Sequence, residues 1–147
     1  MIKTIVSRLI KTYGTNNPFE LCDFLGIKIM KSDLGNEIKG FFQRTANGYS
    51  IVHLNNNLNN NEIKYVCSHE LGHAVIHPDL SIRFFMINKL QVKTKYEIQA
   101  DKFAAELLLP NRLDCEYKNM NVSQLSSCFS VPKELINYRY RRESIYE

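Results

Sequence analysis

The hydrophobic pattern at the start of the chain is helical. Its apolar positions, three or four residues apart, are Ile2, Ile5, Val6, Leu9, Ile10 and Tyr13. This spacing predicts a helix with one core-facing side, which Gly14 ends. Asn17 as a cap, Pro18 in the first turn and Glu20 three residues after the cap then predict a second, short helix that ends at Gly26.

Three short segments that follow have the residue pattern of strands. They cover residues 27–31, 40–44 and 49–54. Asn47-Gly48 separates the last two, and this dipeptide is typical of a tight turn between antiparallel strands. The pattern therefore predicts a small three-stranded sheet.

Two longer segments downstream have the boundaries of helices. The first runs from about residue 61 to Ile76 and ends at His77-Pro78. The asparagine-rich stretch 55–61 before it predicts a loop that could cap this helix, and we assign it no further role. The second helix is predicted over residues 97–110, where the proline stops it.

The last part of the chain predicts two short helices, over residues 122–129 and 133–142, which form a closing helical segment at about 121–142. With the sheet, these elements predict an α+β fold in a single domain over residues 1–147. We expect the three-stranded sheet to pack on the first long helix, with the second long helix beside it.

Residues 80–93 connect the two long helices and carry apolar side chains at several even positions. The imperfect alternation predicts a strand or a flap. An extended segment of this kind could bind a peptide by strand addition, but a buried packing segment is an equally good interpretation.

The first long helix contains the sequence His69-Glu70-Leu71-Gly72-His73. Positions four apart lie about 40° apart around a helix and roughly 6 Å along it, so the two histidines share one face and can reach one metal ion. Glu70 is displaced from that face but lies near enough to take a proton from a water at the metal. The spacing predicts a zinc site with Glu70 as the general base.

A catalytic zinc ion needs a third protein ligand, and the second long helix offers two carboxylates. Glu97 and Asp101 are one turn apart, and Ala100, Ala104 and Ala105 are small enough for two helices to approach closely. We take Glu97 as the third ligand, with Asp101 accepting the free N–H of a liganding histidine. The alternative places Asp101 on the metal and Glu97 outside it.

The remaining histidines and the cysteines predict structural roles. His77 lies too far along the helix from His69 to share its metal and is expected to cap the helix end or to line the cleft. His53 is interpreted as a satisfied strand residue. The cysteines are widely spaced and are expected to be reduced and mostly buried; they are Cys22, Cys67, Cys115 and Cys128.

Several of these segments resemble a known family, the ImmA/IrrE zinc metallo-endopeptidases. The matching motifs are His-Glu-Leu-Gly-His with His77 four residues later, and Glu97-x-x-Ala100-Asp101-x-Phe103-Ala104-x-x-Leu107-Leu108-x-Pro110. Weaker similarity covers about residues 17–142, with Pro132 where a serine is more usual. The resemblance favours Glu97 as the zinc ligand. It also implies a cytoplasmic protease that cuts a partner transcriptional repressor and is often encoded by a phage or an integrative element.

Composition fits a protein of this kind. The 147 residues are 44% hydrophobic and 23% charged, which is enough for one domain with a core. The first residues lack the apolar stretch of a signal peptide, and no segment approaches about 18 apolar residues, so we expect a cytoplasmic protein with one zinc ion per chain.

Two other functions compete with proteolysis. The two C-terminal helices could form a helix-turn-helix, and Tyr138-Arg139-Tyr140-Arg141-Arg142 alternates aromatic and basic residues, as DNA-binding segments can. A net charge of +4 is modest for a nucleic-acid binder, and a solvated terminal helix explains the basic run equally well. The other alternative is a zinc-containing regulator that binds a repressor without cutting it.

Overall fold

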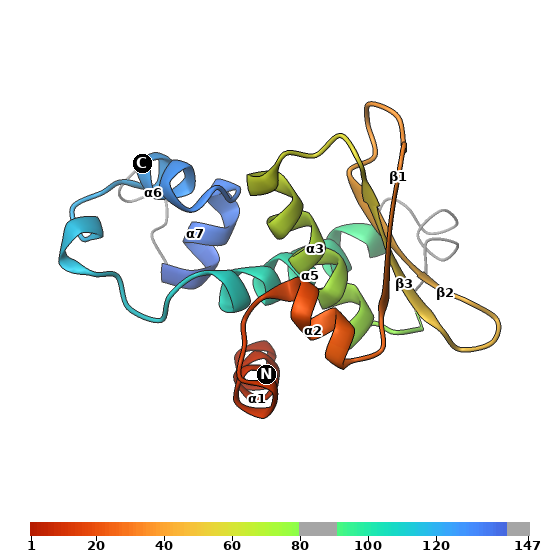
Figure 1. Cartoon of the computed structure of the whole chain (residues 1–147). Coiled ribbons are helices and arrows are strands. Elements are labelled where there is room, and N and C mark those ends of the chain that lie inside the picture. The colour runs from red at the N-terminus through yellow and green to blue at the C-terminus, as the bar shows by residue number, and fades with distance from the viewer. Residues whose placement is uncertain (80–90, 141–147) are drawn as a thin grey trace.

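The structure is a computed structural model that describes residues 1–79 and 91–140, with the side chains of residues 91–94 excepted. Its elements follow in the order α1 (Ile2–Tyr13), α2 (Pro18–Phe24), β1 (Lys28–Ser32), β2 (Gly40–Arg44), β3 (Ser50–Asn55), α3 (Asn60–Ile76), α5 (Gln91–Leu108), the 3-10 helix η1 (Cys115–Tyr117), α6 (Val122–Phe129) and α7 (Lys133–Tyr140). The sheet lies at one end of the molecule and α6 and α7 at the other, with α3 and α5 between them (Figure 1). The predicted α+β fold is confirmed.

The first two helices have the predicted boundaries. Gly14 adopts the left-handed conformation after α1, and its N–H bonds Ile10 O. The Asn17 side chain caps α2 by accepting from the N–H groups of Phe19 and Glu20. The end of α1 and the start of α2 are therefore fixed by local interactions that the sequence predicts.

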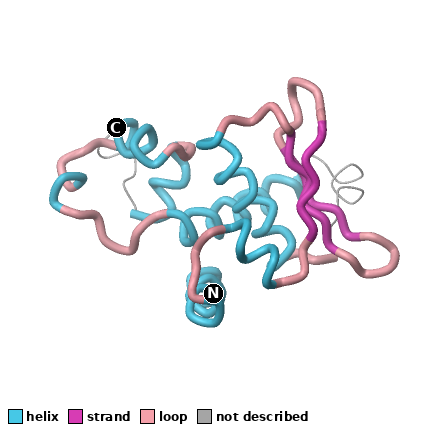
Figure 2. Tube along the Cα trace, viewed as in Figure 1, coloured by secondary structure: helices cyan, strands magenta, loops and turns pink. Residues whose placement is uncertain are grey.

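The three strands form a mixed sheet in the order β1-β3-β2 (Figure 2). Strand β1 is parallel to β3, and β2 is antiparallel to it, joined by the predicted Asn47-Gly48 turn, where Gly48 has a φ of 85°. Val52 and Leu54 of β3 are fully buried in the core that α3 covers. Alternation along β3 thus gives the sheet one face that packs on the helices.

The asparagine-rich stretch has more structure than we predicted. The Asn55 side chain is buried and donates to Gly35 O and Ile38 O, both at 2.8 Å, so that it ties the loop before β2 to the end of β3. Asn59 caps α3 by accepting from the N–H groups of Asn61 and Glu62, which confirms the predicted cap within this stretch. The expectation that this stretch has no role beyond a loop and a cap is wrong for Asn55.

Helices α3 and α5 pack side by side through their small residues. A Cβ atom added at Gly72 would lie 3.1 Å from Phe103 Cβ and 3.2 Å from Ala100 O. Ala100 and Ala104 are fully buried on the facing helix. The close approach predicted from the alanines is confirmed, and it brings the polar side chains of the two helices within reach of one another.

The segment before α5 differs from our expectation. The helix begins at Gln91, ahead of the predicted start at Glu97, so residues 91–93 are helical and not extended. The rest of the predicted strand or flap, residues 80–90, lies outside the described residues. The C-terminal end of α5 is as predicted, with Leu108 its last residue, two positions before Pro110.

Two hydrophobic clusters share the described part of the chain. One joins α1, α2, the sheet, α3 and α5, and includes Leu21, Val52, Leu71 and Phe103. The other joins the end of α5 to α6 and α7. Tyr65 of α3 packs against both clusters, so it lies where the two halves of the core meet.

The cysteines and the hydropathy of the helices complete the description. All four cysteines are free, as predicted, but only Cys22 and Cys67 are buried, while Cys115 and Cys128 are exposed. The expectation that they are mostly buried is therefore wrong for half of them.

Among the described residues, no helix combines the length and the hydropathy that a membrane crossing requires.

Candidate metal centre

Helix α3 presents His69 and His73 on one face, as their spacing predicts. Both side chains are buried, and their rings meet edge to face with centroids 4.9 Å apart. The Nε2 atom of each ring points toward α5 rather than into the sheet, because each is in hydrogen-bond contact with a carboxylate of that helix.

Glu97 of α5 supplies that carboxylate. Its Oε2 lies 3.1 Å from His69 Nε2 and its Oε1 lies 2.8 Å from His73 Nε2. One ligand atom from each of the three residues lies within 4.8 Å of the other two. Among the described residues this is the group of His, Cys, Asp and Glu side chains that could hold a metal ion.

The chemistry of these donors fits a zinc ion. Two imidazole nitrogens and one carboxylate oxygen are a ligand set that catalytic zinc uses, with bonds of about 2.0–2.2 Å and a fourth position left open. Ligand atoms of a tetrahedral site with such bonds lie roughly 3.3 Å apart, close to the separations of Glu97 from the two histidines. All three ligand atoms lie within 4.8 Å of one another, so this ligand set fits a single ion.

Asp101 contacts the other side of the His69 ring. Its Oδ1 accepts from His69 Nδ1 at 2.7 Å and from the Tyr65 hydroxyl at 2.7 Å. A ring that donates from Nδ1 keeps the lone pair of Nε2 for a metal. Glu97 faces Nε2 of both histidines, whereas Asp101 meets only Nδ1 of one, and this geometry favours Glu97 over Asp101 at the metal.

The charges of the centre shift several pKa values. Burial by itself lowers the pKa of His69, but hydrogen bonds to Asp101 and Glu97 and the charge of Glu70 outweigh it and raise the pKa to about 10. Burial would raise the pKa of Glu97, yet its hydrogen bonds to the two histidines hold it well below its usual value. Burial dominates at Glu70, whose pKa is raised.

The other two histidines serve the fold. The backbone N–H of His77 bonds His73 O and caps α3, as predicted, while its Nε2 lies 2.6 Å from Gln99 Oε1 of α5. His53 Nε2 lies 2.7 Å from Gln43 Oε1 on the neighbouring strand, which confirms it as a satisfied strand residue.

Tyr65 is the residue that sequence reasoning missed. It lies one turn before His69 on α3, and its ring centroid is 6.1 Å from that of His69. The available signal was the i, i+4 spacing, which places Tyr65, His69 and His73 along one helical face. The ring of Tyr96, the residue before Glu97, packs edge to face against the ring of His77, with centroids 4.5 Å apart.

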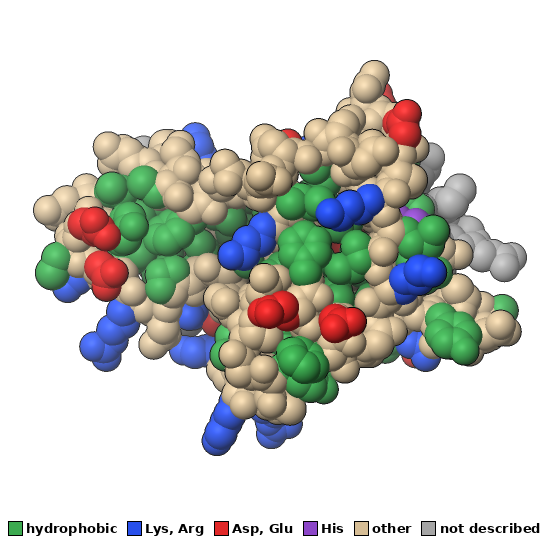
Figure 3. Space-filling view, in the orientation of Figure 1, with side chains coloured by type: hydrophobic (Ala, Val, Ile, Leu, Met, Phe, Trp, Pro, Cys, Tyr) green, Lys and Arg blue, Asp and Glu red, His purple; other side chains and the backbone are tan. Residues whose placement is uncertain are grey.

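Within the described residues, the arginine of the basic C-terminal run contacts other parts of the fold. Helices α6 and α7 confirm the two predicted segments. The Arg139 side chain is 9% exposed, donates to Glu106 at 2.7 Å and to Leu109 O at 3.2 Å, and so faces α5 rather than solvent. Arg141 and Arg142 lie outside the described residues. Lysines and arginines are dispersed over the face that Figure 3 shows.

Comparison with known proteins places the chain among the peptidases. Residues 22–141 match the model of a peptidase family described as the IrrE N-terminal-like domain. The chain is 40% identical to "Uncharacterized immunity region protein 2" of Bacillus phage phi105, over 95% of this chain and 89% of that protein. It is 37% identical to "Metallopeptidase ImmA" of Bacillus subtilis strain 168, over 94% of this chain and 83% of that protein. The chain therefore belongs to the IrrE N-terminal-like family of metallopeptidases.

Proposed function

We propose that this protein is a zinc-dependent endopeptidase of the cytoplasm that cuts a DNA-binding repressor of a phage or mobile element. The observation that carries the proposal is the convergence of His69, His73 and Glu97, with one ligand atom of each within 4.8 Å of the others. The adjacent residue Glu70 is buried, and burial raises its pKa, which is the direction that favours proton transfer by a carboxylate.

Each residue has a defined role in peptide hydrolysis. His69, His73 and Glu97 would hold the ion, and Asp101 fixes the tautomer of His69. Bound zinc supplies Lewis acidity, which polarises the scissile carbonyl and makes water nucleophilic near pH 7. Glu70 accepts the proton of the attacking water and passes it to the leaving amine, a contribution of about 10²–10⁴-fold.

The choice of substrate rests on similarity. One relative carries the name of a phage immunity region protein and another that of a metallopeptidase. The motifs of the ImmA/IrrE family imply proteases that remove repressors. A repressor acts on DNA in the cytoplasm, and we place the reaction there. Engagement of Arg139 within the fold supports a protein rather than a nucleic acid as the partner.

Cleavage of a candidate repressor tests the proposal. The candidate is a small repressor encoded beside this protein, incubated with purified, zinc-loaded enzyme and followed by mass spectrometry of the fragments. Glu70→Gln should lose cleavage by about 10²–10⁴-fold while still binding the repressor. Glu62→Gln is the matched control, because Glu62 lies on the same helix but pairs with Lys39 at the exposed surface. If the wild type and Glu70→Gln both bind the repressor and the wild type does not cleave it, the protein would instead be a non-proteolytic regulator.

Metal content tests the ligand set independently of cleavage. Elemental analysis should find about one zinc ion per chain in the wild type and in Glu70→Gln, and little in His69→Ala, His73→Ala or Glu97→Ala. Full zinc content in Glu97→Ala would remove Glu97 from the metal and assign Asp101 in its place. Asp101→Asn should weaken zinc affinity by about 10–100-fold without unfolding the protein.

A further inference from the structure

Tyr65 contacts both hydrophobic clusters and also Asp101, beside the metal centre. Its ring packs against both hydrophobic clusters. Its hydroxyl lies 2.7 Å from Asp101 Oδ1, on the neighbouring helix. Asp101 Oδ1 also lies 2.7 Å from His69 Nδ1. A single carboxylate oxygen of α5 is therefore held by two donors that lie one turn apart on α3.

The direction of these hydrogen bonds follows from chemistry. An ionised carboxylate can only accept, so the Tyr65 hydroxyl and the His69 ring both donate to Asp101. Burial and the neighbouring charge of Asp101 raise the pKa of Tyr65, which keeps its hydroxyl protonated and able to donate. With one bond alone, the carboxylate could rotate about its side chain; the second bond fixes its orientation.

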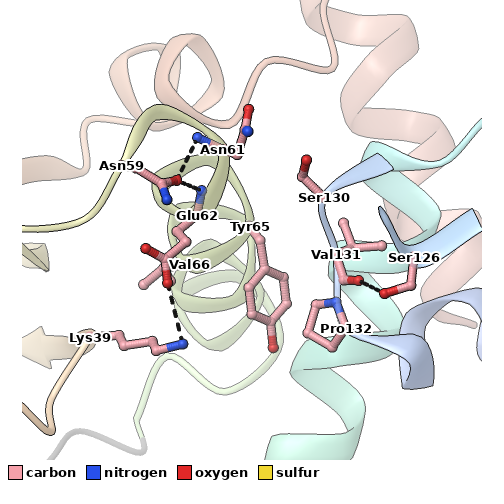
Figure 4. Close-up of a pocket in the computed structure, with 10 residues that line it drawn as sticks. All are labelled: Lys39, Asn59, Asn61, Glu62, Tyr65, Val66, Ser126, Ser130, Val131 and Pro132. Atoms are coloured by element: carbon pink, nitrogen blue, oxygen red, sulfur yellow. Dashed lines mark hydrogen bonds and ion pairs between the residues drawn. The ribbon is translucent and has the colours of Figure 1, made fainter. Parts of the chain in front are cut away.

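Tyr65 also lines a cavity of about 290 Å³. Figure 4 shows Tyr65 projecting from α3 toward Val131 and Pro132, in the turn between α6 and α7. Val131 is buried in the second cluster, and the Ser126 hydroxyl donates to its carbonyl oxygen. The tyrosine thus lies between the C-terminal helices and the metal centre.

We infer that Tyr65 is a positioning residue for the metal centre: its hydroxyl orients Asp101 so that His69 presents Nε2 to the ion. The inference deepens the proposed function, because it assumes that zinc binds at His69, His73 and Glu97.

The test is the zinc dissociation constant of Tyr65→Phe, measured by competition with a chromogenic chelator. This change removes the hydroxyl and keeps the ring. The expected effect is about a threefold to tenfold weaker affinity, smaller than that of a group in direct contact with a ligand. Tyr140→Phe is the matched control: it also removes a hydroxyl with a 2.7 Å hydrogen bond, to Pro110 O, and should leave zinc affinity unchanged.

Two further measurements separate positioning from general stabilisation. The absorption spectrum of the cobalt-substituted protein should change in Tyr65→Phe, because the orientation of a ligand changes, and should stay the same in Tyr140→Phe. In the Asp101→Asn background, Tyr65→Phe should have no additional effect on zinc affinity, since the hydroxyl acts through Asp101.

The outcomes are distinguishable from failure of the proposed function. Zinc affinity and a cobalt spectrum that are both unchanged in Tyr65→Phe, while the wild type binds zinc, would overturn the role of Tyr65 alone. Equal losses in the wild-type and Asp101→Asn backgrounds would also overturn it, because the tyrosine would then act by another route. A wild type that binds no zinc would overturn the proposed function.

Discussion

His69 lies between two carboxylates, and this position determines how many protons its ring carries. Before metal binds, Asp101 contacts Nδ1 and Glu97 contacts Nε2, so both ring nitrogens donate and the ring is cationic. Its pKa of about 10 keeps it protonated throughout the neutral range. A zinc ion needs the Nε2 lone pair and must displace that proton, whereas the other proton remains on His69 Nδ1, which donates it in the hydrogen bond to Asp101.

We therefore predict that zinc binding to the EDTA-treated protein releases a proton from His69. A ligand whose pKa lies above the working pH competes with the metal in its protonated form, so zinc affinity should rise about tenfold per pH unit between pH 6.5 and 8.5. Isothermal titration calorimetry in buffers of different ionisation enthalpy measures the release. Asp101→Asn, which lacks one of the bonds that raise this pKa, should release a smaller fraction. An affinity that is independent of pH would contradict the prediction.

At the scale of elements, the distance between α3 and α5 determines whether the ligands converge. The helices approach each other tightly at Gly72, because a Cβ there would meet Phe103 Cβ at 3.1 Å and Ala100 O at 3.2 Å. Overpacking a tight contact costs about 1–3 kcal/mol, comparable with or larger than the roughly 1 kcal/mol that alanine gains over glycine in a helix.

Gly72→Ala should consequently fail to stabilise the protein and should weaken zinc binding, because α5 and its Glu97 are pushed away from α3. Urea denaturation of the apo protein and chelator competition measure the two effects. Ser68→Ala is a control on the same helix, whose hydroxyl bonds Lys64 O within α3. An apo protein stabilised by about 1 kcal/mol with unchanged zinc affinity would show that the helices accommodate the methyl group.

Arg139 joins α7 to the end of α5 and is expected to stabilise the fold rather than to bind DNA. Its side chain is 9% exposed and that of its partner Glu106 is 20% exposed. Arg139→Ala leaves Glu106 and Leu109 O without this donor and should lower the free energy of unfolding by about 2–4 kcal/mol. Arg8→Ala, on the exposed side of α1, should change it by less than about 0.5 kcal/mol. Chemical denaturation measures both, and equal small effects would contradict this role.

The elements show which parts of the fold the sequence can predict. Caps and turns such as Asn17, Gly14 and Asn47-Gly48 act within a few residues, and their effects were predicted correctly. The start of α5 was missed because residues 91–96 are mostly polar and carry no apolar stripe at helical spacing. Asn55 was missed because its partners, Gly35 O and Ile38 O, are brought to it only by the folded loop.

In the metal centre too, some contacts could be predicted from the sequence and others could not. The pairing of His69 with His73 follows from helix geometry alone, and the contact of Asp101 with His69 was predicted from the chemistry of zinc ligands. The hydroxyl contact of Tyr65 depends on how α3 and α5 are rotated relative to each other, and no local pattern encodes that rotation.

At the scale of the whole molecule, zinc would bridge the two helices between the clusters of the core. A ligand that binds only the folded state stabilises it by RT ln(1 + [L]/Kd), about 4 kcal/mol at a free concentration 1,000 times Kd. Thermal denaturation should therefore show a higher Tm with zinc than with EDTA. His73→Ala should show no zinc-dependent shift, and a shift equal to that of the wild type would place the ion elsewhere.

The separation of the ligands between two helices also has a consequence for timing during synthesis. Glu97 follows His73 by 24 positions, so a growing chain that has folded α3 still lacks the carboxylate. Three ligands come together only when α5 has been made and has docked on α3, which itself depends on non-local contacts. The metal centre is therefore completed only after both helices have been synthesised and have packed together, which makes it a late product of folding.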